Sequence, residues 1–128
     1  SIEGEGKDRK DGIGLPGNQE ALVLAGAAVA KKTGLVLVNG GGIALSSALI
    51  DKVDAILEAV LPAQMGGTAV AATLAGDAAP AGRMPYTVPA SLDDVPPIVN
   101  YDMNATIGGR WLGRTYRYAQ PVPQWPFG

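Results

Sequence analysis

The stretch from residue 35 to residue 40, LVLVNG, decides how the rest of the chain is interpreted. It is a short apolar run of mostly branched side chains, and glycines bound it at Gly34 and Gly40. A continuous apolar run of this length is typical of a strand in a parallel sheet, which is covered on both faces. We therefore expect a buried parallel strand here, with helices in the segments that flank it.

The segment before this strand predicts a helix over residues 19–32. Asn18 can cap this helix, because its side chain can accept a hydrogen bond from an unpaired N–H of the first turn. Gly34 is a suitable helix stop. Apolar residues recur at steps of three and four positions, the period of an α-helix: Leu22, Ala25 and Val29.

The segment after the strand continues the alternation. Residues 46–52 predict one or two helical turns, and residues 53–60, VDAILEAV, predict a second strand that Asp54 and Glu58 interrupt. TAVAATLAG, at residues 68–76, predicts a small-residue helix that ends at its glycine. Helices that alternate with short apolar strands indicate right-handed βαβ units around a mostly parallel sheet.

The chain is expected to form a single α/β domain over residues 1–128. Residues 82–89, GRMPYTVP, predict a loop that leads into a short strand. From residue 90 to residue 128, prolines, glycines and aromatic residues are frequent and periodicity is weak. We interpret residues 90–128 as an extended, irregular tail of the same domain.

Composition excludes several classes of chemistry. The 128 residues carry a net charge of −2, so there is no basic field to attract nucleic acid, and no apolar run is long enough to span a membrane. Cysteine and histidine are both absent. Thiolate chemistry, a Ser-His-Asp triad and most zinc sites are therefore excluded, and no cofactor or metal is expected. Acid–base chemistry must come from carboxylates, tyrosine or lysine.

One glycine motif resembles a dinucleotide-binding loop. Gly12, Gly14 and Gly17 match the pattern G-x-G-x-x-G, and a predicted helix follows them. However, the segment before the motif is charged rather than a buried strand, and Pro16 removes an N–H where a pyrophosphate would need one. The next strand ends in Asn39 and not in the acidic residue that holds a ribose. A simple turn from loop to helix is the favoured interpretation.

Four segments in this order resemble one known family: IEGEGKDR…LPGNQEALV, VLVNGGG…LS, VDAIL…PAQMGGTAVAATLAGDAAPAGRMPYT and GRTYRY…WPFG. Together they are similar to the second domain of family 3 glycoside hydrolases, in the branch of plant- and fungal-type β-xylosidases. The resemblance covers essentially the whole chain. It implies a three-layer α/β sandwich with a mostly parallel sheet.

The resemblance also implies a function, the hydrolysis of β-xylosides or β-glucosides with retention of configuration. In that family, a preceding (β/α) barrel carries an aspartate nucleophile, and the sandwich domain lends the general acid/base from a loop at the interface. Glu3 is the first candidate for that acid, and Glu5 is the second. Asp8 and Arg9 match the family's GxDR segment and are expected to position the loop by a charge-assisted hydrogen bond. From their chemistry alone, both glutamates could equally be solvated loop residues.

The expected partners are therefore a barrel domain or subunit and a glycoside substrate. The chain lacks the barrel and is expected to be a fragment that is inactive alone. The family also implies secretion, although no signal peptide is visible. Several positions carry smaller side chains than the family usually has, which keeps a non-catalytic structural or interaction module as the alternative: Gly26, Gly34, Gly42, Ala63, Ala75 and Ala79.

Overall fold

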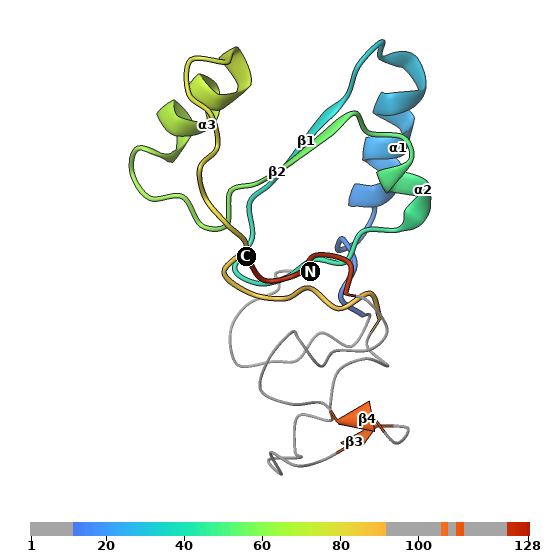
Figure 1. Cartoon of the computed structure of the whole chain (residues 1–128). Coiled ribbons are helices and arrows are strands. Elements are labelled where there is room, and N and C mark those ends of the chain that lie inside the picture. The colour runs from blue at the N-terminus through green and yellow to red at the C-terminus, as the bar shows by residue number, and fades with distance from the viewer. Residues whose placement is uncertain (1–11, 92–105, 108–109, 112–122) are drawn as a thin grey trace. The chain divides into compact units, whose positions relative to one another are not determined.

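The computed structural model describes four ranges of the chain, residues 12–91, 106–107, 110–111 and 123–128 (Figure 1). The described residues belong to two compact units. The strand unit comprises residues 18–41 and 46–82. The loop unit comprises residues 12–17, residues 42–45 and the described residues from Arg83 onward. The chain therefore leaves the strand unit after residue 41 and returns to it at residue 46.

A parallel pair of strands forms the centre of the strand unit. β1 (Gly34–Leu37) and β2 (Ala55–Glu58) pair in parallel, with the first residues of the two strands opposite each other and likewise the last. The connection between them contains a short helix, α2 (Ser47–Ile50), which confirms the predicted strand–helix–strand order. Burial is less complete than predicted, since Leu37 is buried while the other residues of both strands are exposed or half-buried.

The first helix begins where the sequence predicts and ends earlier. α1 spans Gln19–Val29, with Asn18 at its N-cap position. The side chain of Asn18 makes no capping hydrogen bond, so that part of the prediction is wrong. The predicted stop at Gly34 is also wrong, because Ala30 is already extended (φ −83°, ψ 146°) and Gly34 is the first residue of β1. The residues in between are needed to reverse the chain direction from helix to strand.

The apolar residues that predicted α1 do not face the interior of the strand unit. Leu22 is 74% exposed and Val29 is 88% exposed, and Ala25 is exposed as well. The half-buried side carries four other residues: Glu20, Val23, Leu24 and Ala27. Because α1 is apolar on nearly all sides, the helical period alone does not select the face that packs inward.

The last helix of the strand unit, α3 (Gly66–Ala75), begins two residues before the predicted start. Its predicted end is confirmed, because Gly76 caps the helix with φ 83°, a left-handed conformation that glycine adopts without strain. Gly66 lies against the ring of Pro62, so closely that an added Cβ would come within 2.8 Å of the Pro62 Cγ. Glycine is therefore required where the helix begins, since even the Cβ of alanine would clash with Pro62.

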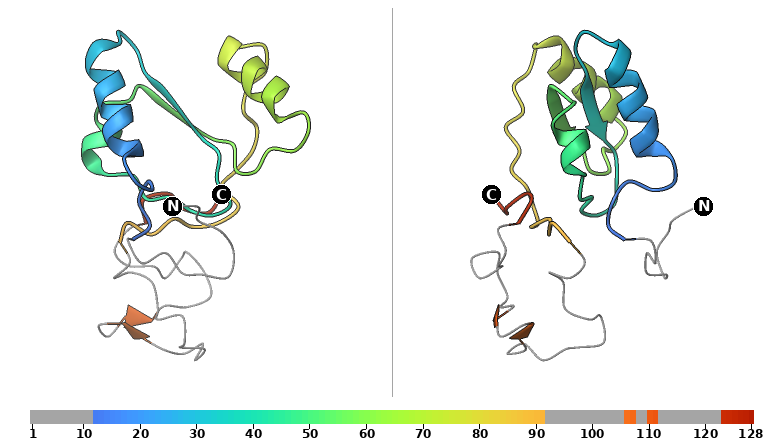
Figure 2. Two further views of the ribbon diagram at one scale, coloured as in Figure 1. Left: turned by 180° about the vertical axis from the view of Figure 1, so that it is seen from behind. Right: turned by 90° about the vertical axis from the view of Figure 1, so that its right-hand side faces the viewer.

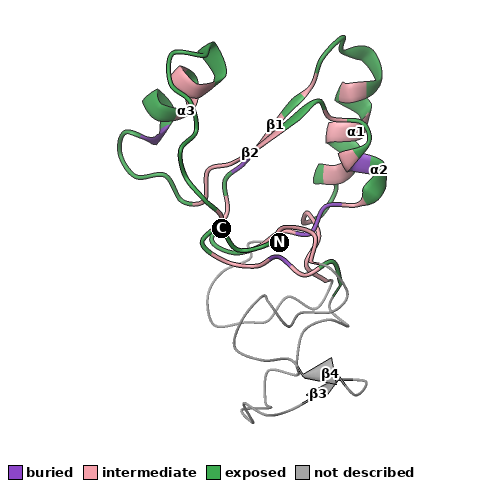
Figure 3. Cartoon of the chain, in the orientation of Figure 1, coloured by how far each residue is buried: buried purple, intermediate pink, exposed green. Residues whose placement is uncertain are grey.

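The helices of the strand unit lie on both sides of the strand pair. α1 and α2 are together on one side and α3 is on the other (Figures 1 and 2). Leu37 and Leu49 are buried, whereas most of the surface of α1 and α3 is exposed or half-buried (Figure 3). A parallel strand pair with flanking helices is the α/β class that the sequence predicts.

The loop unit is held by backbone hydrogen bonds between segments that are distant in sequence. The N–H of Val88 donates to the carbonyl of Trp125 (2.8 Å), and the N–H of Trp125 donates back (3.3 Å). This single bridge replaces the short strand predicted within residues 82–89. The Gly128 N–H donates to the Met84 carbonyl (3.1 Å), so the two segments continue side by side.

Two very short strands are described in the predicted tail. β3 (Thr106–Ile107) and β4 (Arg110–Trp111) pair antiparallel. The described part of residues 90–128 therefore contains only two-residue strands, as expected for a segment of weak periodicity.

Candidate functional site

The four residues predicted to serve the active site lie outside the described residues: Glu3, Glu5, Asp8 and Arg9. The described residues begin at Gly12, immediately after this charged segment. What the structure provides is the base of the predicted acid–base loop, residues 12–17, and the groups that hold it.

The base of the loop is attached to the segment 42–45. The Ala44 N–H donates to the carbonyl of Ile13 at 2.9 Å. A Cβ at Gly14 would lie 3.7 Å from the Ala44 carbonyl oxygen, an ordinary contact distance, so this position does not require glycine. Gly12 (φ 96°) and Gly17 (φ 57°) adopt left-handed conformations that favour glycine. Two of the three glycines of the dinucleotide-like pattern, Gly12 and Gly17, therefore serve backbone turns.

A glutamine side chain holds the next residue of the same segment. The Leu45 N–H donates to Gln124 Oε1 (2.7 Å), and Gln124 Nε2 donates to the Leu45 carbonyl (2.6 Å). Leu45 is 4% exposed, so these backbone groups need partners within the protein. Gln124 supplies both from a position 79 residues away in sequence.

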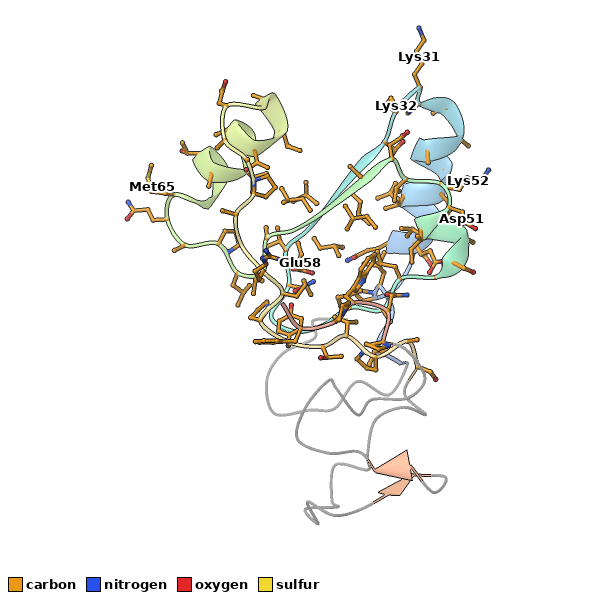
Figure 4. The ribbon with its side chains drawn as sticks, in the orientation of Figure 1. Lys31, Lys32, Asp51, Lys52, Glu58 and Met65 are labelled. Carbon is orange, nitrogen blue, oxygen red and sulfur yellow. The ribbon has the colours of Figure 1, made fainter. Side chains whose placement is uncertain are left out.

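In the strand unit, polar groups gather at the C-terminal ends of the two strands. The Glu58 carboxylate, which ends β2, accepts from Asn39 Nδ2 (3.2 Å) and from the Val60 N–H (2.9 Å), and Glu58 is half-buried. The Asn39 N–H donates to the Val60 carbonyl (3.0 Å), which completes a ring of three hydrogen bonds. We call Asn39, Glu58 and Val60 the strand-end cluster; Figure 4 labels Glu58 within it.

Val60 has an unusual backbone conformation within this cluster. Its φ is 54°, and it is the one non-glycine residue with positive φ in the described part of the chain. A β-branched residue in the left-handed region is strained, at a cost of about 1–3 kcal/mol. Because Glu58 and Asn39 bond to both backbone groups of Val60, the cluster maintains this strained turn.

The strand-end cluster occupies a place where open α/β sheets commonly bind ligands, outside the C-terminal ends of the strands. Within the described residues, the Asn39 Oδ1 atom is buried without a hydrogen-bond partner. Both Glu58 oxygens are occupied by donors, which makes this carboxylate a group that holds backbone in place. The cluster thus stabilises the strand ends, and the structure assigns it no substrate contact.

The opposite ends of the two strands carry an exposed ion pair. Lys32 Nζ lies 2.5 Å from Asp54 Oδ1, and the Thr33 N–H donates to Asp54 Oδ2 (2.8 Å). The hydrogen bonds from Lys32 and from the Thr33 backbone lower the pKa of Asp54. The hydrogen bond and charge of Asp54 in turn raise the pKa of Lys32. Figure 4 shows Lys32 and Glu58 at opposite ends of the strand pair.

A serine links the two helices on one side of the sheet. The Ser46 Oγ accepts from the Leu49 N–H (3.1 Å) as the N-cap of α2, and it donates to Glu20 Oε1 of α1 (2.5 Å). The sequence placed Glu20 in the first turn of α1, but its contact with Ser46 depends on the tertiary fold.

Sequence reasoning did not identify the strand-end cluster or Gln124. Asn39 and Glu58 stand at the ends of two successive apolar runs. Because parallel strands bring such ends together, the sequence could have predicted that these two residues lie close to each other. Gln124 left no such signal in the sequence, because its partner is backbone and lies in a distant segment.

No helix within the described ranges has the length and apolar character for a membrane crossing. Nor do three acidic side chains come together there as a metal site would require.

Comparison with known proteins gives a match over the whole chain. The model of the glycosyl hydrolase family 3 C-terminal domain matches residues 1–128. No solved structure matches the chain.

Three relatives illustrate the likeness. The chain is 38% identical to beta-xylosidase/alpha-L-arabinofuranosidase 1 of Medicago sativa subsp. varia over 100% of its length, which is 17% of that protein. It is 41% identical to exo-1,4-beta-xylosidase bxlB of Emericella nidulans, again over 100% of its length and 16% of that protein. Beta-glucosidase B of Emericella nidulans is 37% identical over 90% of the chain and 14% of that protein. The chain thus spans about one sixth of the curated relatives it matches.

Proposed function

The chain belongs to the family of glycosyl hydrolase family 3 C-terminal domains, and on this basis we propose that it serves an enzyme that hydrolyses β-xylosides or β-glucosides. The observation that carries the proposal is the similarity to named beta-xylosidases and a beta-glucosidase at 37–41% identity. Since those proteins are about six times longer, the proposed reaction uses groups beyond this chain, with a barrel domain or subunit as the partner.

The proposed mechanism is hydrolysis with retention of configuration. A carboxylate of the partner attacks the anomeric carbon, and a second carboxyl group about 5–5.5 Å away protonates the leaving oxygen. The same group then activates the water that releases the sugar. We assign this role to Glu3 and keep Glu5 as the second candidate, with Asp8 and Arg9 as positioning residues. The match of the family model from residue 1 onward supports the assignment, because it includes the segment that carries these residues.

We also propose that the strand unit is part of a larger three-layer α/β sandwich. A parallel sheet of two strands is marginal by itself, and parallel sheets are normally covered on both faces. Large apolar side chains on α1 and α3 support the proposal, because Leu22, Val29 and Leu74 are 64–88% exposed in this chain. Further strands and an adjoining domain would cover such surfaces.

The proposal is tested in the complete natural polypeptide with glycosides of different leaving groups. Glu3→Gln should lower kcat on an alkyl β-xyloside by about 10²–10⁴-fold, because that leaving oxygen is basic and needs a proton. The glycosylation step of a nitrophenyl β-xyloside should suffer less, and azide should partly rescue the second step because it needs no general base. Asp51→Asn is the matched control, because this exposed acid of the strand unit is far from residues 1–11 in sequence.

Three outcomes would contradict parts of this proposal. Equal losses on both glycosides without azide rescue would remove the role from Glu3, and the split pattern found in Glu5→Gln would transfer it to Glu5. Turnover by the isolated 128-residue chain that survives repurification would refute a site shared with a partner. No turnover by the complete polypeptide would favour the non-catalytic module.

A further inference from the structure

The residue pair Asn39–Gly40, which follows β1, combines a thermolabile side chain with an accessible backbone nitrogen. The backbone nitrogen of the residue after an asparagine can attack the side-chain amide carbon, and glycine hinders this attack least because it has no Cβ. Gly40 is exposed, and its N–H donates no hydrogen bond to any group within the described residues. The attacking nitrogen is therefore free to approach the Asn39 amide.

The amide that would be attacked is held by one carboxylate. Asn39 Nδ2 donates to Glu58 Oε2 at 3.2 Å, the long end of the usual range. Asn39 Oδ1 is buried and has no hydrogen-bond partner within the described residues. The Asn39 N–H donates to the Val60 carbonyl (3.0 Å), which holds the backbone but leaves the side chain free to rotate. Glu58 is thus the polar contact that keeps the amide away from Gly40.

We propose that Asn39 is a modification site, which converts slowly and without an enzyme to aspartate or isoaspartate at a rate that Glu58 restrains. The Gly40 nitrogen gives its proton to solvent and bonds to Asn39 Cγ. The Cγ–Nδ2 bond then breaks, and Nδ2 leaves as ammonia, which leaves a five-membered imide ring. Water opens the ring at either carbonyl and yields aspartate or isoaspartate. One water is consumed and one ammonia is released, so the conversion needs no other reactant.

The conversion should prevent the strand-end cluster from forming again. The product has lost the Nδ2 donor and places a second carboxylate beside that of Glu58, and like charges at close range repel. Isoaspartate also inserts the Asn39 Cβ into the main chain, directly before the turn at Gly40. The modification would therefore open the C-terminal end of the β1–β2 pair permanently.

The first test follows the conversion in the complete polypeptide during incubation in neutral buffer. Trypsin releases residues 33–52, in which Asn39 carries the one side-chain amide, and mass spectrometry detects the replacement of NH₂ by OH. Asn39 should convert at least about tenfold faster than Asn18, whose side chain makes no capping bond but which Gln19 follows. Chromatography should show isoaspartate, the signature of the ring. Conversion no faster than at Asn18, or aspartate alone, would overturn the proposal.

The second test hinders the attack without changing the fold. A Cβ at Gly40 would have Leu61 Cδ1 as its nearest contact, at an ordinary 3.7 Å, and Gly40 has no positive φ. Gly40→Ala should therefore fold normally and slow the conversion at least about tenfold. Gly41→Ala is the matched control, because its Cβ meets nothing within 4 Å and lies one residue beyond the attacking nitrogen. Equal rates in Gly40→Ala and the unsubstituted polypeptide would overturn the ring mechanism.

The third test removes the restraint. Glu58→Leu should accelerate conversion of Asn39 by more than about tenfold, because a donor without its acceptor favours the open state. Asp54→Leu, at the opposite ends of the strands, is the control and should leave the rate unchanged. Glu58→Gln keeps one acceptor and should accelerate less, which preserves the test if the leucine variant does not fold. No acceleration in either Glu58 variant, or an equal rise at Asn18 from general unfolding, would overturn the role of Glu58. These readouts use no turnover and are independent of the proposed function.

Discussion

The two ends of the β1–β2 pair each carry a carboxylate, and the two carboxylates are held by different kinds of partner. At the N-terminal ends, Asp54 pairs with a lysine whose side chain is 83% exposed, while Asp54 itself is 38% exposed. At the C-terminal ends, half-buried Glu58 accepts from a side-chain amide and a backbone N–H. Exposed ion pairs contribute little, whereas a buried donor that loses its acceptor is costly. The neutral partners should therefore matter more for stability than the formal ion pair.

The largest effect is expected at the strand-end cluster. Glu58→Leu keeps a similar volume but leaves the Val60 N–H and the Asn39 amide without an acceptor, so the opening free energy of β1 and β2 should fall by about 2 kcal/mol. Amide exchange of Leu37 and Leu57, whose N–H groups point into the β1–β2 ladder, measures this quantity. Glu58→Gln retains one acceptor and should cost about half as much. A loss no larger than that of Asp54→Leu would contradict the comparison.

A smaller effect is expected from the strained backbone of Val60. Glycine adopts φ 54° freely, so Val60→Gly removes strain while it loses side-chain contacts and gains unfolded-state entropy. Val60→Ala is the matched control, because it loses the same side-chain contacts but keeps a Cβ at a positive φ. Val60→Gly should therefore destabilise the strand pair by about 1 kcal/mol less than Val60→Ala, as measured by the same amide exchange. Equal losses would show that the turn carries no strain.

The smallest effect is expected at the exposed ion pair, and it should depend on pH and salt. The pKa of Asp54 is lowered in the folded state, so its contribution is present above about pH 4 and disappears as the pH falls through the folded value. The pKa of Lys32 is raised, so its contribution is present below about pH 10 and disappears as the pH rises through the folded value.

The pH dependence can be read from exchange at the Thr33 amide, which donates to Asp54. Protection beyond the intrinsic pH dependence of exchange should decrease below about pH 4 in the unsubstituted chain, and Asp54→Asn should abolish this acid-dependent step. Raising the salt concentration should weaken the pair, since exposed charges are screened. A step that persists in Asp54→Asn would have to come from another carboxylate.

The sequence predicts the elements of the strand unit well because local patterns determine them. The apolar run before Asn39 predicts β1, the run around Glu58 predicts β2, and Gly76 correctly ends α3. The errors lie where tertiary contacts decide. α1 stops at Val29 although helix-forming residues continue, because the chain must reach β1.

The candidate site is less accessible to sequence reasoning. The resemblance that identifies the family also supplies Glu3, but chemistry alone does not separate Glu3 from a solvated acid. Gln124 was missed for a physical reason, since a side-chain amide that binds backbone leaves no pattern in the sequence of its partner. The inward face of α1 was ambiguous because alanine, leucine and valine surround the helix.

The distance in sequence between Leu45 and Gln124 has a consequence for synthesis on the ribosome. The two residues are 79 positions apart, and the chain grows at about 5–20 residues per second. Leu45 therefore emerges about 4–16 s before the side chain that pairs with its backbone. During that interval, the buried backbone groups of the 42–45 segment must be hydrated or held by another binder, such as a chaperone. The Gln124 side chain thus completes an attachment whose other half was synthesised 79 residues earlier.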